Sequence, residues 1–408
     1  MSHQVLLPDR VFDSVAGDML EDHAVVIEAD RVLEVVPADG VGVTERLAGY
    51  SLLPGLIDVH THLAIPLDTG QGFAAVVQRS GAQDALLGAK QAEETIRAGF
   101  TSVRDAGTWR AFTDVALRDA IDAGWLIGPR MTCAGAFVGC PGGGADITGL
   151  AVDVDEVLPR ELRFGIVTGA DQMRATVRQI LRYGADFIKV LATGAVLTAG
   201  TRPGAAELTD DELQAAVETA AEAGTHVAAH AHGVEGIKRA VGAGVRSIEH
   251  GSLNDYESIE LMVERGTYLI ADLYDSEYIL DNGPRLGYSD EVMEKTRMTA
   301  FAQREGFAKA VDAGVRIAFG SDAAVFPHGL QGRQFRHYVE YGLSPAAAIQ
   351  SATRWAAELL DKEDEVGTLA PGTYADLVGV AGDPLQDVSL LEDVALVMKS
   401  GEWVVGPK

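Results

Sequence analysis

Cysteine and positive charge are both scarce in this chain of 408 residues. Its two cysteines, Cys133 and Cys140, are too few for a fold built on disulfides, and they form neither a CxxC pair nor a zinc-ribbon pattern. This cysteine usage is typical of a reducing compartment, so we expect a cytoplasmic protein. The basic residues number 33 against 60 acidic ones, and the net charge of −27 argues against binding to nucleic acid or to an anionic membrane surface.

Long apolar runs are missing as well. No stretch reaches the ~18 apolar residues of a membrane helix, and Asp9, Arg10 and Asp13 interrupt the region where a signal peptide would have its apolar core. Hydrophobic residues nevertheless make up 47% of the chain, which is enough for a large core. We therefore expect a globular protein without membrane contact, whose partner is a small molecule.

The two ends of the chain differ in texture from the middle. Residues 24–37, 372–383 and 394–405 are rich in β-branched side chains and are broken by turn residues. Between them, short apolar runs alternate with amphipathic segments of helical period, such as 209–224 with Thr209 as its N-cap. Eight such runs are present: 55–63, 101–107, 130–135, 186–194, 226–232, 247–251, 267–274 and 316–323.

Eight apolar strands that alternate with helices predict an α/β fold in which a parallel sheet closes into a (β/α)8 TIM-type barrel. An open, doubly wound sheet is the alternative. The chain contains no GxGxxG after its first strand and no GxxxxGK[ST], the phosphate-binding motifs that such open sheets often carry.

Polar side chains stand near the C-terminal ends of several predicted strands. His60 and His62 are two residues apart, so a strand would point both to the same side, where a shared metal ion would explain two buried imidazoles. The alternative is one histidine satisfied in the core and one at the solvent edge. Lys189 lies within its apolar run, either as a lysine that reaches a salt bridge at the rim or as an amine that carries a CO2-derived carbamate.

The same pattern recurs on three further runs. His230 and His232 repeat the spacing of two, His250 ends the sixth run and Asp322 ends the eighth. Each residue alone has a structural explanation, but packing does not predict that all of them gather at the same ends of the strands. The set therefore indicates a metal site at the C-terminal mouth of the barrel, where active sites of this fold form.

The motifs resemble the binuclear branch of the metal-dependent amidohydrolase superfamily. The resemblance is strongest to the group of ochratoxinase, the Xaa-Pro and Xaa-Arg dipeptidases and imidazolonepropionase. It rests on LLPGLIDVHTHL (52–63), FIKV (187–190), VAAHAHG (227–233), SIEHG (247–251), GSDA (320–323) and GTLAPGTYADLVGVAGDPL (367–385).

The resemblance implies two divalent metal ions, expected to be zinc. His60, His62 and Asp322 would hold the more buried ion. His230 and His250 would hold the more exposed ion, and carboxylated Lys189 would bridge the two.

The resemblance also implies a distorted barrel with a small β-sandwich built from both chain ends. The barrel would span 55–363, and the sandwich would combine 1–54 with 364–408. Relatives are often homo-oligomers, so we expect one here.

Such a centre implies hydrolysis of an amide C–N bond by a metal-bridging hydroxide, with Asp322 as the group that moves the proton. His232, beside the metal ligands, is expected to act in catalysis. The expected substrate is a dipeptide or an N-acyl amino acid, ochratoxin-like amides included. Two alternatives stay open: a urea, carbamate or cyclic amide as substrate, and a metal-binding scaffold that has lost turnover.

Two glycine-rich loops, 139–149 and 193–207, are candidate lids over the site. Three residues are candidate substrate contacts: Asp146 in the first loop, Arg202 in the second, and Tyr274 at the end of the seventh run. Arg202 is the cation that could meet a substrate carboxylate. Asp272 and Asp275 flank Tyr274 and would favour a basic group in the substrate.

Overall fold

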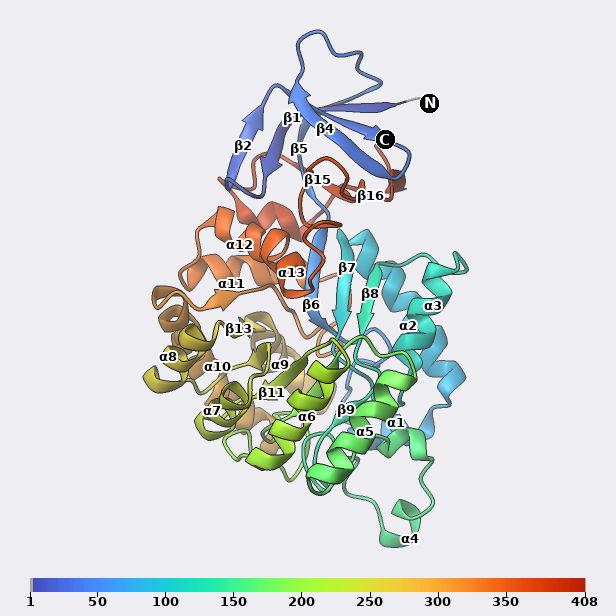
Figure 1. The fold of residues 1–408 in the computed structure, drawn as a ribbon, viewed down its shortest axis with the longest axis vertical. Helices are drawn as coiled ribbons and strands as arrows, with labels where there is room; N and C mark the ends of the chain where they lie inside the picture. Colours follow the sequence, from blue (N-terminus) through green and yellow to red (C-terminus); the bar gives the residue numbers. More distant parts are fainter. Residues whose placement is uncertain (1–2, 408) are drawn as a thin grey trace.

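The computed structural model describes residues 3–407. Figure 1 shows a barrel of strands surrounded by helices and, above it, a β-sheet to which both ends of the chain contribute. The architecture confirms the predicted fold class, a distorted (β/α)8 barrel with a small β domain built from both chain ends; the strands of the predicted β-sandwich are hydrogen-bonded into one mixed sheet. Across the described residues, no helix has the length and apolar character that crossing a bilayer demands.

The added unit is one mixed sheet of eight strands. The start of the chain supplies β1 (Gln4–Asp13), β2 (Asp18–Glu21), β3 (His23–Glu28), β4 (Arg31–Pro37) and β5 (Glu45–Pro54). The end supplies β15 (Leu377–Ala381), β16 (Leu396–Lys399) and β17 (Glu402–Val405). The order is β17-β16-β15-β5-β1-β3-β4, with β2 paired to β1, so the antiparallel pair of β5 and β15 joins the two chain ends.

The barrel strands are short and buried. They are β6 (Leu56–Thr61), β7 (Phe100–Asp105), β8 (Arg130–Cys133), β9 (Phe137–Val138), β10 (Ile188–Leu191), β11 (Val227–Ala231), β12 (Ser247–His250), β13 (Tyr268–Ile270) and β14 (Arg316–Ile317). Each of the eight predicted runs contains one of these strands, and β9 follows directly after the third run. Nearly all their residues are buried, because helices cover the outside and side chains fill the inside.

The barrel is built from two sheets. Strands β6, β7 and β8 form one, and β9 to β14 form the other, with parallel pairing throughout. Hydrogen bonds close the two seams. At one, the Asp186 N–H donates to the Cys133 carbonyl over 2.8 Å; at the other, several bonds join 59–62 to 319–323, among them Val59 N–H to the Phe319 carbonyl over 2.8 Å. The interrupted ladders make this a distorted barrel.

Helices follow most strands. They are α1 (Phe73–Gln78), α2 (Gly81–Arg97), α3 (Thr113–Asp122), α4 (Val152–Asp155), α5 (Ala170–Arg182), α6 (Asp210–Glu222), α7 (Val234–Ala243), α8 (Tyr256–Arg265), α9 (Leu273–Leu286), α10 (Asp290–Asp312), α11 (Gln334–Glu340), α12 (Pro345–Ser351) and α13 (Arg354–Leu359). Thr209 caps α6 as predicted, since its hydroxyl accepts from the Glu212 N–H and the Glu212 carboxylate accepts from the Thr209 N–H.

The strands run away from the mixed sheet. The start of β6 touches that sheet through the Gly55 N–H, which donates to the Asp376 carbonyl over 2.8 Å, and Figure 1 shows β7 and β8 pointing to the opposite end. The C-terminal mouth of the barrel is thus the end that the mixed sheet leaves open. The domain limits at 54/55 and 363/364 stay a prediction; they fall between β5 and β6 and between α13 and β15.

Candidate metal centre

The side chains predicted to bind metal converge at the C-terminal mouth. They line one cavity of about 930 Å³ and are almost fully buried: His60, His62, Lys189, His230, His250 and Asp322, together with His232. They come from β6, from β10 to β12 and from the loop after β14. Residues far apart in the sequence therefore meet because parallel strands end at a common rim.

One group consists of His60, His62 and Asp322, each of which offers a ligand atom within 4.8 Å of the others. The Asp322 Oδ1 atom lies 3.1 Å from the His62 Nε2 atom and 3.6 Å from the His60 Nε2 atom. The other ring nitrogens have partners: His62 Nδ1 lies 2.7 Å from the Gly107 carbonyl, and His60 Nδ1 lies 2.8 Å from Glu249 Oε2. Such partners orient an imidazole so that Nε2 faces a metal ion.

A second group consists of His230, His232 and His250, whose ring centroids lie 4.4 to 4.7 Å apart. His250 Nδ1 is 2.7 Å from Asp272 Oδ2, and the amide of Gln303 donates to the other oxygen of Asp272 over 2.8 Å. His232 Nδ1 is 2.7 Å from the Ser252 hydroxyl. The geometry thus offers His232 as a possible ligand as well, whereas the resemblance places it beside the metal ions.

Lys189 lies beside the first group. Its side chain is 2% exposed, its Nζ atom is 3.4 Å from His60 Nε2, and no carboxylate of residues 3–407 lies within 4.0 Å of that nitrogen. Burial lowers the pKa of Lys189 to about 8, so a fraction of the amine is uncharged near neutral pH. A buried amine without an anionic partner fits the chemistry of a carbamate, which forms from the uncharged amine and turns it into an anionic oxygen ligand.

The charge states of Asp322 and His60 suit metal binding. In His62, by contrast, burial would lower the pKa, but Asp322 raises it above its ordinary value and so favours the protonated form while no metal ion is bound. Burial would raise the pKa of Asp322, but the neighbouring His60 and His62 lower it below the usual range, so Asp322 is ionised. Burial, reinforced by the charge of Lys189, lowers the pKa of His60 to about 3, so its imidazole is neutral at pH 7. An ionised carboxylate and a neutral imidazole are the forms that bind metal ions.

The backbone is strained at two of these residues. His250 and Asp322 have φ values of 70° and 57°, in the left-handed region that side chains other than glycine seldom adopt. Along β12, Ser247 and Glu249 face the barrel interior, so regular alternation would point His250 outward. The left-handed conformation turns His250 inward, which is the kind of strain that folds retain at functional sites.

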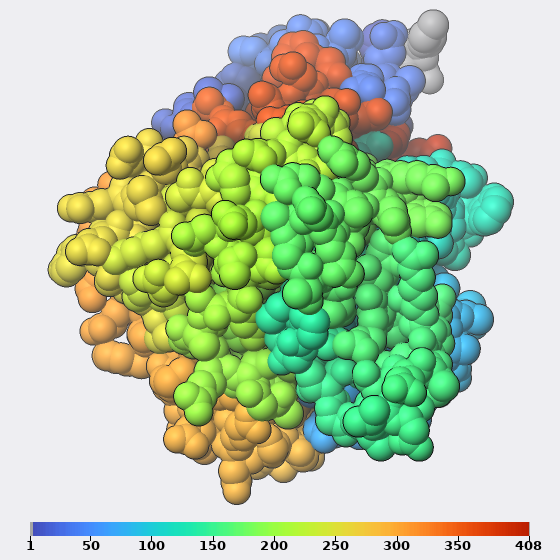
Figure 2. Space-filling model, turned by 60° about the horizontal axis from the view of Figure 1, so that its bottom comes forward, coloured from blue at the N-terminus to red at the C-terminus, as the bar shows by residue number. Residues whose placement is uncertain are grey.

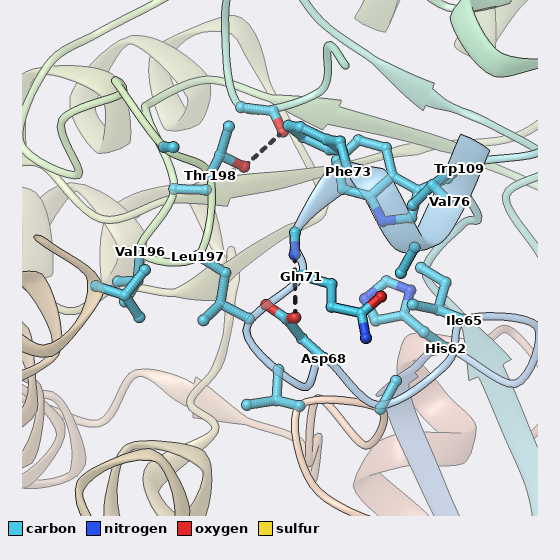
Figure 3. A pocket seen from close by; sticks show the side chains of 18 of the residues that line it. His62, Ile65, Asp68, Gln71, Phe73, Val76, Trp109, Val196, Leu197 and Thr198 are labelled. Atoms are coloured by element: carbon cyan, nitrogen blue, oxygen red, sulfur yellow. Dashed lines mark hydrogen bonds between the residues drawn. The ribbon is translucent and has the colours of Figure 1, made fainter. Parts of the chain in front are cut away.

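Loops from three parts of the chain form the cavity walls. Residues 65–77 contribute Phe73 on α1, whose ring centroid lies 4.9 Å from that of Trp109. The ring centroids of Trp109 and Phe137 are also 4.9 Å apart. Figure 3 shows Val196 and Leu197 on the opposite side of the cavity from Trp109. The walls are therefore mainly apolar, above a floor of histidines.

Both predicted lid loops reach this cavity. Residues 144, 148–150 and 195–200 lie on its wall, and the Thr198 hydroxyl donates to the Gly144 carbonyl over 3.3 Å, which links the two loops. Figure 2 shows the molecule turned toward this end, where green segments that include α5 cover much of the face. Whether these loops move as lids stays a prediction.

The three predicted substrate contacts do not reach the cavity wall. Tyr274 is buried in the first turn of α9, where its hydroxyl accepts from Arg333 over 3.0 Å. Asp146 is held by Arg163 through two hydrogen bonds of 2.9 Å, and Arg202 is exposed outside the lining. Of the flanking acids, Asp275 lines the cavity. The contacts were placed by loop position, which does not tell which way a side chain turns.

Sequence reasoning missed two sets of residues. One is the wall formed by 65–77, Trp109 and Phe137, which carries no periodic pattern. The other is the buried pair Arg104 and Glu249, which contacts His60 from below. A signal for this pair existed, since both are charged residues within apolar runs, as Lys189 is.

Comparison with known proteins identifies the family. Residues 51–404 match the amidohydrolase family. The ochratoxinase of Aspergillus niger is 32% identical over 416 residues, which cover 96% of this chain and 84% of that protein.

Solved structures agree with this assignment. A Xaa-Pro dipeptidase with bound methionine in its active site superposes with a TM-score of 0.91 at 34% identity, covering 99% of this chain and all of the other. A prolidase complexed with N-methylphosphonate-L-proline superposes with a TM-score of 0.89 at 31% identity, again over 99% of this chain. The chain belongs to the amidohydrolase family and is a hydrolase of C–N bonds.

Proposed function

We propose that this protein hydrolyses the amide bond of a dipeptide or an N-acyl amino acid with apolar groups, using two divalent metal ions, expected to be zinc. The observation that carries the proposal is the pair of ligand groups at the floor of an apolar cavity of about 930 Å³. Relatives described as an ochratoxinase and as a Xaa-Pro dipeptidase support the amide class.

In this proposal, His60, His62 and Asp322 would hold one ion, and His230 and His250 would hold the other. Lys189, once carboxylated, would add an anionic oxygen ligand between the two groups. Two such ions would lower the pKa of a shared water to near neutrality and would polarise the carbonyl of the substrate.

The chain's own groups handle the proton and the developing charge. The ionised Asp322 accepts a proton from the attacking water and delivers it to the amide nitrogen, so that the C–N bond breaks with a neutral amine as leaving group. His232 has its Nδ1 held by Ser252, so its Nε2 can donate to the carbonyl oxygen as that oxygen gains negative charge. The apolar walls bind the flanking groups and limit access of water.

Metal analysis and a substrate panel test the proposal. After purification with zinc and bicarbonate we expect two metal ions per chain and release of a free amino acid from dipeptides or N-acyl amino acids. Fewer than one ion per chain would contradict the metal centre, and full loading without turnover of any amide or ester would favour a scaffold.

A pair of lysine variants sharpens this test. Burial lowers the pKa of both Lys189 and Lys399 to about 8, but Lys399 lies at the mixed sheet, where its ammonium donates to the Gly128 carbonyl over 2.7 Å. Lys189→Met should lose most of the bound metal, whereas Lys399→Met should keep both ions. Equal metal content in the two variants would contradict a bridging role for Lys189.

One observation favours a second substrate class. Among the described residues that line the cavity, Lys189 is the one lysine or arginine, so no other ammonium or guanidinium group is available for a substrate carboxylate. A urea, carbamate or cyclic amide without a carboxylate would fit that lining. Turnover of such compounds, with none of N-acyl amino acids, would decide for this alternative.

A further inference from the structure

A fully buried arginine crosses the barrel interior below the metal ligands. Arg104 on β7 is 0% exposed, and its guanidinium donates to the Val59 carbonyl over 2.6 Å, to the Ser247 hydroxyl over 3.2 Å and to Glu249 Oε1 over 2.8 Å. The ring centroid of Phe187 lies 5.1 Å from its guanidinium carbon. Arg104 is thus held in one position by partners from β6 and β12.

Its partner Glu249 is equally buried and connects the arginine to a metal ligand. Glu249 Oε1 accepts from Arg104 and, over 2.5 Å, from the Ser247 hydroxyl, while Oε2 lies 2.8 Å from His60 Nδ1. Replacing a buried ion pair with apolar side chains often leaves stability unchanged, so stability alone does not account for this arrangement. Its contact with His60 points to a role in the site.

The pair of Arg104 and Glu249 connects the two sheets of the barrel, and each sheet carries part of the metal centre. His60 and His62 belong to the sheet of β6, β7 and β8, whereas Lys189, His230 and His250 belong to the sheet of β9 to β14. Arg104 lies on the first sheet, and Ser247 and Glu249 lie on the second. Their contacts join the sheets directly beneath the ligands, where the two halves of the centre meet.

We propose that Arg104 and Glu249 are positioning residues, which fix the two halves of the metal centre at their spacing and hold His60 with its proton on Nδ1. The inference rests on the metal-dependent function proposed above. With Glu249 Oε2 at 2.8 Å from His60 Nδ1, the carboxylate would favour the tautomer that carries its proton on Nδ1 and leaves Nε2 unprotonated, as a metal ligand must be. Arg104 and Ser247 hold the Oε1 atom of Glu249, which keeps Oε2 turned toward His60.

The variant Glu249→Gln tests the tautomer because an amide has one oxygen and one NH2 group. If the NH2 group faces His60, the ring proton is driven to Nε2 and blocks metal binding. If the oxygen faces His60, the NH2 group meets the donors of Arg104 and Ser247. We therefore expect the variant to bind Zn²⁺ or Mn²⁺ about 10-fold to 100-fold more weakly in competition with a chelator.

The double variant Arg104→Met/Glu249→Met separates positioning from stability. It removes both charges and leaves no unpaired buried ion, so we expect the metal-free protein to unfold within a few degrees of wild type. Its two bound Mn²⁺ ions should nevertheless show weaker magnetic coupling in EPR spectra, because β7 and β12 lose the side-chain contacts that join them beneath the ligands and the backbone bonds between 59–62 and 319–323 remain there. The matched control is Asp376→Asn, which breaks a buried pair with Arg130 at the mixed sheet and should leave metal affinity unchanged.

The outcomes are distinguishable. A wild-type protein that binds fewer than two ions would overturn the proposed function, and this inference with it. Two ions in wild type, together with wild-type affinity in Glu249→Gln and wild-type coupling in the double variant, would overturn this inference alone. An equal loss of affinity in Asp376→Asn would also overturn it, since the effect would then be one of general stability.

Discussion

The two ends of the barrel differ in how their charged and titratable side chains are partnered. At the end covered by the mixed sheet, charged groups pair with one another: Arg130 lies 3.0 Å from Asp376, and the guanidinium carbons of Arg31 and Arg130 each lie 3.5 Å from the ring centroid of Tyr374. At the open mouth, no carboxylate of the described residues lies within 4.0 Å of the Lys189 ammonium nitrogen, and ring nitrogens of several histidines face a cavity. The paired charges stabilise the contact between the barrel and the mixed sheet, whereas the side chains at the mouth are available to bind a ligand.

A single strand shows the same contrast. His226, just before β11, stacks on Phe187 with ring centroids 5.7 Å apart, while His230 and His232 at the other end of β11 face the cavity. Residue type alone therefore does not indicate function. The end of the strand on which a histidine lies separates a packing role from a binding role.

The largest expected difference between the two ends comes from replacing one buried aspartate at each, Asp322 at the mouth and Asp376 at the mixed sheet. Asp322→Asn should lower kcat about 1,000-fold, because the amide cannot take a proton from the attacking water. Asp376→Asn should leave kcat/KM within about twofold of wild type and lower the unfolding temperature. Steady-state kinetics on the best amide of the panel measure the rate constants of both variants, and thermal unfolding measures the temperature. If Asp322→Asn stays within about tenfold of wild type, the proton role is wrong.

The next effect concerns stability at the covered end. Tyr374→Leu removes the ring that both Arg31 and Arg130 contact, and should lower the free energy of unfolding by about 1–2 kcal/mol with unchanged kcat/KM. Chemical denaturation followed by circular dichroism measures the change. Tyr256→Leu is the control, because Tyr256 is 72% exposed on α8, where the Lys309 ammonium lies 5.8 Å from its ring centroid. Equal losses in the two variants would show that the Tyr374 contacts add nothing.

The wall of the mouth should act on substrate binding and not on chemistry. Trp109→Leu removes two edge-to-face contacts, with Phe73 and Phe137, and should raise KM about 3-fold to 10-fold while kcat changes little. Trp125→Leu, at a tryptophan that is 81% exposed after α3, should change neither constant. A fall in kcat without a rise in KM for Trp109→Leu would place this ring in the catalytic machinery instead.

The last effect is a pH dependence at the covered end. Burial, then the charges of Arg104 and Arg246, lower the pKa of His226 to about 3 from its ordinary value of 6.5. Below pH 6.5 the unfolded chain binds a proton that the folded protein does not, so stability falls with falling pH between 6.5 and 3, by at most about 1.4 kcal/mol per pH unit. His226→Phe should flatten this part of the curve in denaturant unfolding at pH 5 to 7. Parallel curves for both proteins would contradict it.

The sequence predicted the floor of the site far better than its walls. The spacing of two between His60 and His62, and between His230 and His232, places side chains on one face of a strand, and a parallel barrel brings strand ends together. His250 was found by its place at the end of a run and by resemblance. Regular alternation along β12 would point His250 outward, and no sequence pattern predicts its left-handed backbone conformation.

The residues of the cavity walls could not be predicted from side-chain alternation, because loops have no periodic backbone conformation. Asp146 is neutralised by Arg163, 17 residues further on, and nothing in the loop sequence specifies that pair. Tyr274 ends its run as predicted, but the first turn of α9 directs it toward Arg333. Arg104 and Glu249 were within reach, since they follow the same rule as Lys189, a charged residue within an apolar strand.

The joining of both chain ends in one sheet has a consequence for protein synthesis. The Ser51 hydroxyl donates to the Gly382 carbonyl across 331 residues, so β5 leaves the ribosome long before its partner β15 exists. At the usual speed of translation, this interval is roughly 20–60 s, during which one edge of β5 has no strand to pair with. The barrel is translated within that interval. Closure of the mixed sheet can therefore occur only on a chain whose translation has passed β15.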